Sequence, residues 1–320
     1  MTEQWTSALS FSSFSVPLRP DGTPATTDPR RSIEDLAMRW QSHSGRGATA
    51  GWASDAALRK AAVPGPYGAL VNRVVEIHGL AGSIGEQLTL AWAAEQDAQR
   101  FQSPEIERPT EHLETTLAAQ RMAVRALCEM SSHFLLGAVH SLANLVLRVL
   151  LCDAQAAAVI NAQKVNRPAR GFEPASSQRA AWPTFSPGAE LWSRVLPEAA
   201  QASGLQPHAT LVARLLKLQQ DPRFDALDTR RGMDYHRHRP QSLDHRSPSS
   251  GIVSTDMATG TSTMRMPIAR TDARSDEQVV HCICIDALNC VAEVMDDMEP
   301  LLADALSACH LVWRPGSVRF

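Results

Sequence analysis

Apolar residues recur at helical spacing along most of this chain, and polar, proline-containing stretches separate the runs. Three runs are long, over residues 67–101, 112–152 and 275–309, and apolar side chains return in them every three or four positions, as in an amphipathic helix. Alanine and leucine dominate while only 5% of residues are aromatic, so helix propensity favours the same interpretation. Shorter helices are predicted over residues 154–163, 190–203 and 207–219.

Three glycines, Gly79, Gly82 and Gly85, lie in the middle of the first long helix. Glycine weakens a helix, but it also allows another backbone to approach closely. The sequence therefore predicts either a kink or a close helix crossing at this point.

The predicted fold is mostly all-α, a bundle of four or five long helices joined by irregular loops. One small β-hairpin is predicted around Gly260. The prediction divides the chain into a loosely ordered N-terminal arm (1–28), a short helical extension (29–66), the bundle (67–310) and a C-terminal tail (311–320).

Composition limits the classes of function. The net charge of -3 gives no overall basic excess, so a nucleic-acid partner would have to bind a local patch. The six cysteines lie in apolar runs, as small buried hydrophobic residues do, and Cys282 and Cys284 are two positions apart, which places them on different faces of a helix. We therefore expect neither a metal site nor a cofactor.

The same patterns bear on localisation. Residues 1–18 have no basic segment followed by a long apolar core, so they do not predict a secretory signal. The longest apolar run, residues 134–151, is interrupted by His140, Asn144 and Arg148, which predicts a buried helix and not a membrane span. A cytoplasmic location without a membrane partner is the expectation.

Polar residues on the second long helix lie along one face. A solvent-exposed face is one interpretation, but such a face usually carries Glu and Lys, whereas this one carries His, Ser and Asn. That composition suits a half-buried seam that faces a site or a partner chain, and both interpretations remain open. The residues follow one another at steps of four, three, one, three and four positions: His133, Gly137, His140, Ser141, Asn144 and Arg148.

Acid-base and phosphate-binding side chains are concentrated in residues 228–241. The chain has no GxxxxGK(S/T), HExxH, CxxC or GxSxG motif and no GxGxxG after a strand, so the usual NTPase, zinc and hydrolase templates are absent. What remains is Arg231 and His236, with four residues between them, a spacing that at a helix start can bring both side chains to one side. Such a pair suits phosphodiester chemistry, because arginine neutralises charge on phosphorus and histidine transfers the proton.

Through this motif, residues 67–310 resemble the HEPN superfamily of helical bundles, which includes metal-independent ribonucleases with an Arg-x4–6-His motif. The resemblance implies a homodimeric endoribonuclease of a toxin or phage-defence system, acting on RNA and, in a toxin system, bound by an antitoxin. Arg231 would stabilise the phosphorane-like transition state, His236 would act as general acid or base, and Asp234 would orient them. The supporting residues would be Arg230 (an alternative at a spacing of five), Tyr235, His238, His140 and Asn144.

Two other pairs have a similar spacing, Arg73 with His78 and Arg239 with His245. The position of the predicted pair after an apolar helix, among further Arg and His residues, distinguishes it from them.

Two alternatives stand beside the ribonuclease. One is a non-catalytic helical protein that dimerises or binds a partner or nucleotide. The other is a solvated helix start whose Arg and Asp side chains form weak local ion pairs. A metal site at His236 and His238 is disfavoured because two histidines alone are an incomplete ligand set.

Overall fold

The computed structural model describes the following residues: 17, 19–28, 32–44, 67–102, 113–162, 182–186, 188–236, 252–256, 261–265 and 276–313. Within helices and strands, side chains are described from residue 73 in the first long helix, from 119 in the second, as far as 231 in the motif helix, and from 278 in the last helix.

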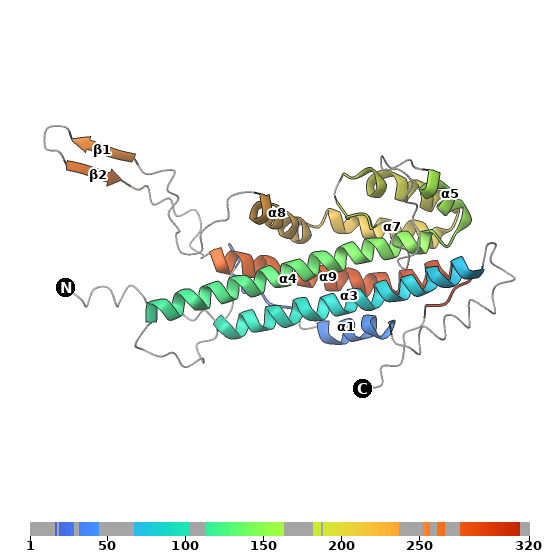
Figure 1. Cartoon of the computed structure of the whole chain (residues 1–320), viewed down its shortest axis with the longest axis horizontal. Helices are drawn as coiled ribbons and strands as arrows, with labels where there is room; N and C mark the ends of the chain where they lie inside the picture. The colour runs from blue at the N-terminus through green and yellow to red at the C-terminus, as the bar shows by residue number, and fades with distance from the viewer. Residues whose placement is uncertain are drawn as a thin grey trace.

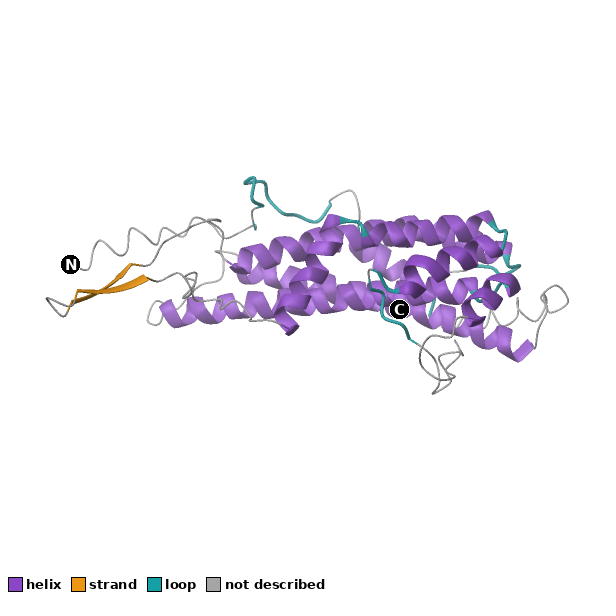
Figure 2. Cartoon of the chain, turned by 90° about the horizontal axis from the view of Figure 1, so that it is seen from above, coloured by secondary structure: helices purple, strands orange, loops and turns teal. Residues whose placement is uncertain are grey.

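Three long helices form the frame of an all-α bundle. They are α3 (Tyr67–Gln102), α4 (Leu113–Leu150) and α9 (Asp276–Ala308), and they run side by side along the long axis of the molecule (Figures 1 and 2). Their bounds agree with the predicted runs to within a few residues. α9 continues through Pro300. At 36 residues, α3 is about 54 Å long.

The helix α1 (Ile33–Ser42) crosses α3 at the predicted glycines. A Cβ atom at Gly85 would lie 2.5 Å from the backbone nitrogen of Gln41, and one at Gly82 would collide with the side chain of Ser44. Gly79 has nothing within 4 Å of its Cβ position and takes no part in the contact. Of the two predicted outcomes, the close crossing is confirmed at Gly82 and Gly85.

Shorter helices cover one side of the frame (Figure 1). α5 (Ala154–Ala162) packs on α6 (Leu196–Ala202), and the π-helix η2 (Leu191–Val195) leads directly into α6. Gly204, with a φ of +67°, follows α6, and α7 (Gln206–Gln219) comes next. α7 and the following helix, α8 (Pro222–His236), both pack on α9.

Two short strands, β1 (Ile252–Asp256) and β2 (Thr261–Arg265), pair antiparallel where the sequence predicts a hairpin. Ile252 lies opposite Arg265, and Asp256 lies opposite Thr261.

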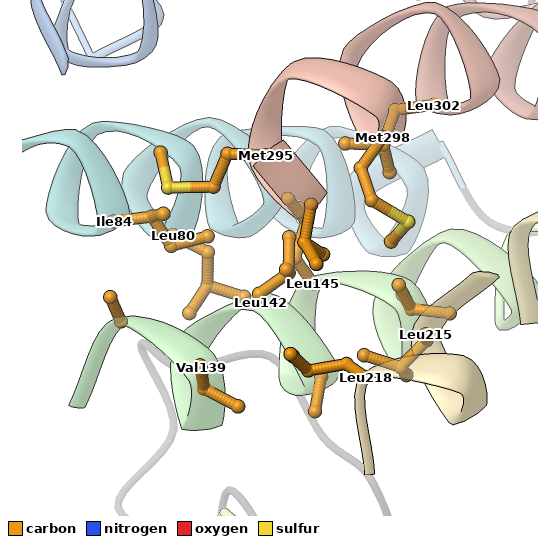
Figure 3. Packing of buried hydrophobic residues seen from close by; sticks show 14 of the residues in the cluster. Leu80, Ile84, Val139, Leu142, Leu145, Leu215, Leu218, Met295, Met298 and Leu302 are labelled. Carbon is orange, nitrogen blue, oxygen red and sulfur yellow. The ribbon is translucent and has the colours of Figure 1, made fainter. Parts of the chain in front are cut away.

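One hydrophobic core joins α1, α3, α4, α6, α7 and α9. Leu142 and Leu145 of α4 meet Leu80 of α3, Met295 of α9 and Leu215 of α7, as Figure 3 shows. Core residues also come from outside the predicted bundle region: Trp40 in the predicted extension and Leu311 in the predicted tail are both buried.

Residues 19–28 of the N-terminal arm lie along α9. Ala25 is buried beside Ile285, and the side-chain amide of Asn289 donates to the carbonyl of Thr26 while accepting from the backbone N–H of Asp28. Acidic residues of α9 hold this segment and three helices through ion pairs: Asp286 with Arg19, Asp296 with Arg39 of α1, Asp297 with Arg214 of α7, and Glu293 with Arg223 of α8.

Two helical stretches in the described residues, Ala119–Leu150 and Gln278–Ala308, are long and apolar enough to cross a membrane by length and composition alone. In the apolar 18-residue window within each stretch, 72% and 67% of the residues are buried inside the protein. Core helices of a bundle have the same composition, so this is weak evidence for a span.

Candidate functional site

The motif residues lie in the last turns of α8 and not at its start, so the expected position at a helix start is wrong. The helix begins at Pro222, where proline needs no N–H partner, and Asp221 accepts the backbone N–H of Arg223 at 2.9 Å as an N-cap. The Arg223 guanidinium holds the pKa of Asp221 down at about 2, so this cap is ionised at neutral pH. The helix then continues to His236.

This placement changes the geometry of the predicted pair. Five residues along an α-helix rotate by about 500°, which leaves the positions of Arg231 and His236 about 140° apart around the axis of α8. The two positions therefore do not share one helical face, contrary to the expectation for a helix start.

Arg231 instead approaches a candidate from another helix. It is exposed, and its guanidinium is close enough to His140 on α4 to lower the pKa of that imidazole. Burial is the larger cause of the lowered pKa, and the carboxylate of Asp228 opposes both effects. The charges of Arg231 and Asp228 on α8 thus act on the imidazole of His140 on α4, and these two helices pack on each other.

The proton on His140 is assigned by its hydrogen bond. The backbone N–H of Phe185 donates to Nδ1 of His140 at 3.2 Å, so Nδ1 is the acceptor nitrogen. Because the lowered pKa keeps the ring neutral at pH 7, the remaining proton is on Nε2. In this state His140 can donate a hydrogen bond through Nε2. Its basic nitrogen, Nδ1, already accepts the hydrogen bond from Phe185.

The polar face of α4 holds a segment of the same chain that is neither helix nor strand. We call this segment, Trp182–Ser186, the strap. Asn144 donates through Nδ2 to the carbonyls of His140 at 2.8 Å and Pro183 at 3.1 Å. Arg148 lies under the Trp182 ring, with its guanidinium carbon 5.1 Å from the ring centroid.

The other residues of the polar face of α4 differ in exposure, so some fit the solvent-face interpretation and others fit the half-buried seam. Arg148 is fully buried and donates from Nε to Glu76 on α3 at 2.6 Å, whereas His133 is exposed. An internal segment covers this part of the face, so that Asn144 is buried while His140 stays half-exposed. The composition indicated a half-buried seam, and the strap is what it faces.

The other predicted site residues are placed as follows. Arg230 is buried in α8. Asp234 and Tyr235 lie in the last turn of α8 with His236, and the structure describes their backbone only. His238 lies outside the described residues.

The cysteines do not form a reactive site. All six are free thiols, and burial raises the pKa of Cys290 and of Cys309 to about 12. Such thiols are poor nucleophiles and metal ligands at neutral pH. Within the described residues, no three His, Cys, Asp or Glu side chains are placed to hold a metal ion.

Sequence reasoning missed Trp182 and Phe185 near the candidate site, and it included Asp228 in residues 228–241 without giving it a role. Asp228 is three positions before Arg231 and so shares its helical face, which the spacing alone could have indicated. For the strap, the available signal was a pair of aromatic residues three positions apart in an otherwise polar, proline-rich stretch.

A separate groove of about 360 Å³ lies between α6 and α7. Pro197, Leu205, Val212 and Leu216 line it together with Ala and Gln residues, and no charged side chain does. None of the predicted site residues contributes to this groove.

Comparisons with protein-family models, with curated proteins and with solved structures find no match to this chain.

Proposed function

We propose that the protein is a metal-independent endoribonuclease that resembles the HEPN type. The observation that carries the proposal is that the charge of Arg231 on α8 lowers the pKa of His140 on α4, where these two helices pack on each other. The two residues are 91 positions apart, and the sequence patterns indicated each of them separately. Metal-free cleavage of RNA needs a cation for the phosphate and a group that transfers protons, since RNA supplies its own nucleophile in the 2′-hydroxyl.

The roles follow from the chemistry of each group. Arg231 neutralises the charge that develops on the phosphorus centre, and its exposure leaves it accessible to a polyanion. His236 transfers the proton, with Asp234 orienting the pair. His140, neutral and protonated on Nε2, donates a hydrogen bond to a phosphate oxygen beside Arg231.

A second copy of the chain would complete the site. Positions 231 and 236 are about 140° apart around one helix, which favours a site that takes the two residues from different copies of α8. A two-fold dimer solves this, since one copy then contributes Arg231 and the other contributes His236 to each site. The proposed enzyme is therefore a homodimer with two composite sites, as expected for a toxin or phage-defence nuclease.

The test is cleavage of a mixed RNA pool in EDTA by the wild-type protein, Arg231→Ala and His236→Ala. We expect cleavage by the wild type and a loss of at least about 100-fold in each variant, because general acid-base catalysis contributes that much. Two control substitutions lie away from the proposed site: His133→Ala at an exposed position of α4, and Arg194→Ala, whose charge pairs with Glu190 and Glu198. Both should cleave like the wild type.

Two results count against the enzyme. One is the absence of cleavage by the wild type, and the other is equal cleavage by the wild type and His236→Ala. The alternative function, a non-catalytic protein that dimerises or binds a partner, is supported by the uncharged groove between α6 and α7. That groove suits an apolar side chain better than a nucleotide phosphate, and this alternative predicts no cleavage by any variant.

A further inference from the structure

We propose that the face of α4 formed by His140, Asn144 and Arg148 is a binding site for an extended peptide, and that the strap is a built-in, imperfect occupant of it. The partner is a protein segment with two aromatic residues three positions apart and, directly after the first, a residue that has a backbone N–H. This proposal does not depend on the ribonuclease activity.

Side chains at successive turns of α4 bind the peptide backbone of the strap. Nδ1 of His140 accepts the N–H of Phe185, and Nδ2 of Asn144 donates to the carbonyl of Pro183. Nε1 of Trp192 on η2 also donates to the carbonyl of Thr184, at 2.8 Å. Three consecutive residues of the strap are therefore bound through main-chain atoms, which any extended peptide offers.

Two aromatic positions supply the specificity. Phe185 is buried and meets the Trp192 ring edge-on at a centroid distance of 5.3 Å. Trp182 covers the Arg148 guanidinium, yet 47% of its surface is exposed. Phe185 is thus a fully buried anchor of the strap, whereas Trp182 is a half-exposed one.

The strap leaves one hydrogen-bonding group of the site unused. Oδ1 of Asn144 is buried and has no hydrogen-bond partner among the described residues. A side-chain amide can pair with both the N–H and the C=O of one extended residue, but the residue whose carbonyl it binds is Pro183, which has no N–H. An unsatisfied buried acceptor costs about 1–3 kcal/mol.

This mismatch makes the strap replaceable. The strap is attached close to its site, at an effective concentration on the order of millimolar, so a peptide of identical sequence competes poorly with it. A peptide that satisfies Asn144 gains the missing hydrogen bond. With proline at position 183, the strap covers the site, but a segment that also donates a hydrogen bond to Asn144 can displace it.

The test uses fluorescently labelled peptides and the full chain carrying Trp182→Ala, a substitution at a half-exposed position that weakens the strap. We expect a peptide of residues 181–187 (AWPTFSP) to bind this variant about tenfold more tightly than the wild type, because the strap has lost an anchor. A peptide with alanine in place of the first proline (AWATFSP) should bind about tenfold more tightly again. Adding Asn144→Leu should abolish that second difference.

Failure to bind either peptide at millimolar concentration, or equal binding of the two peptides, would overturn the proposal. So would dimerisation of the variant that free peptide cannot compete away, because the occupant would then be the strap of a second copy. A measurement on the unaltered protein provides an independent check. The Phe185 amide should exchange its hydrogen at least about 100-fold faster than amides in the centre of α4, because the strap opens locally. Exchange of Phe185 only by global unfolding would make the strap a fixed part of the core and refute the proposal.

Discussion

The carbonyl oxygen of Ala37 on α1 lies 2.6 Å from the position that a Cβ atom would occupy at Gly85 on α3. A methyl group at Gly85 would therefore push α1 away from α3, since the two atoms nearest to it belong to the backbone of α1. We expect Gly85→Ala to lower the free energy of unfolding by about 1–3 kcal/mol, as overpacking does.

Gly79→Ala is the matched control on the same helix. Its Cβ position is open, so the substitution should raise stability by up to about 1 kcal/mol through helix propensity alone. Urea denaturation of the two variants measures both effects. Equal stabilities would show that α1 does not cross α3 at Gly85.

The buried ion pair between Arg148 and Glu76 gives a second prediction. Both side chains are almost completely buried, so Arg148→Met leaves the carboxylate of Glu76 in the core. Among the described residues, Arg73 is then the cation that pairs with it, at 3.1 Å. We expect a loss of about 3 kcal/mol in the free energy of unfolding. The control is Arg100→Met, which removes an exposed pair with Asp97 and should change stability by less than about 0.5 kcal/mol. A loss of the same size in both variants would contradict this account of the core.

Stability should fall in mild acid because of His78. Burial lowers the pKa of this imidazole from about 6.5 in the unfolded chain to about 4, and its Nδ1–H donates to the carbonyl of His43. Since the folded-state pKa is the lower one, the contribution of His78 is complete above pH 6.5 and is lost as the pH falls towards 4. The loss amounts to about 3 kcal/mol.

The check is chemical denaturation between pH 7 and 4. His78→Asn keeps a donor for the His43 carbonyl but does not titrate, so its stability should depend less on pH than that of the wild type. A residual dependence is expected from His140 and His208, whose pKa values burial also lowers. Parallel curves for the two proteins would rule out His78 as the cause.

Much of the helical frame was predictable because its signals are local. Apolar periodicity located α3, α4 and α9, and the glycines indicated where a neighbour would cross. The start of α8 was also available in the sequence, as an Asp-Pro pair at residues 221 and 222. Apolar periodicity gives α8 only a weak helical signal, because the helix has few apolar residues, Phe224 and Leu227 among them.

The candidate site was less predictable because its contacts are long-range. The composition of the α4 face showed that Asn144 and His140 were unusual for a solvent face, but periodicity contains no information about which distant segment covers them. Phe185 and Arg231 reach His140 from 45 and 91 positions away, and only the packing of the helices brings them there.

The composite site on α8 is the central claim, and mixing two inactive variants tests it most directly. Arg231→Ala and His236→Ala are unfolded together, refolded as a mixture and assayed for RNA cleavage in EDTA. Random pairing gives half of the dimers one copy of each variant, and one of the two sites in such a dimer has both Arg231 and His236. The mixture should therefore recover about a quarter of the wild-type activity. Each variant alone should stay inactive. A mixture as inactive as its components, beside an active wild type, would contradict a site shared between two copies.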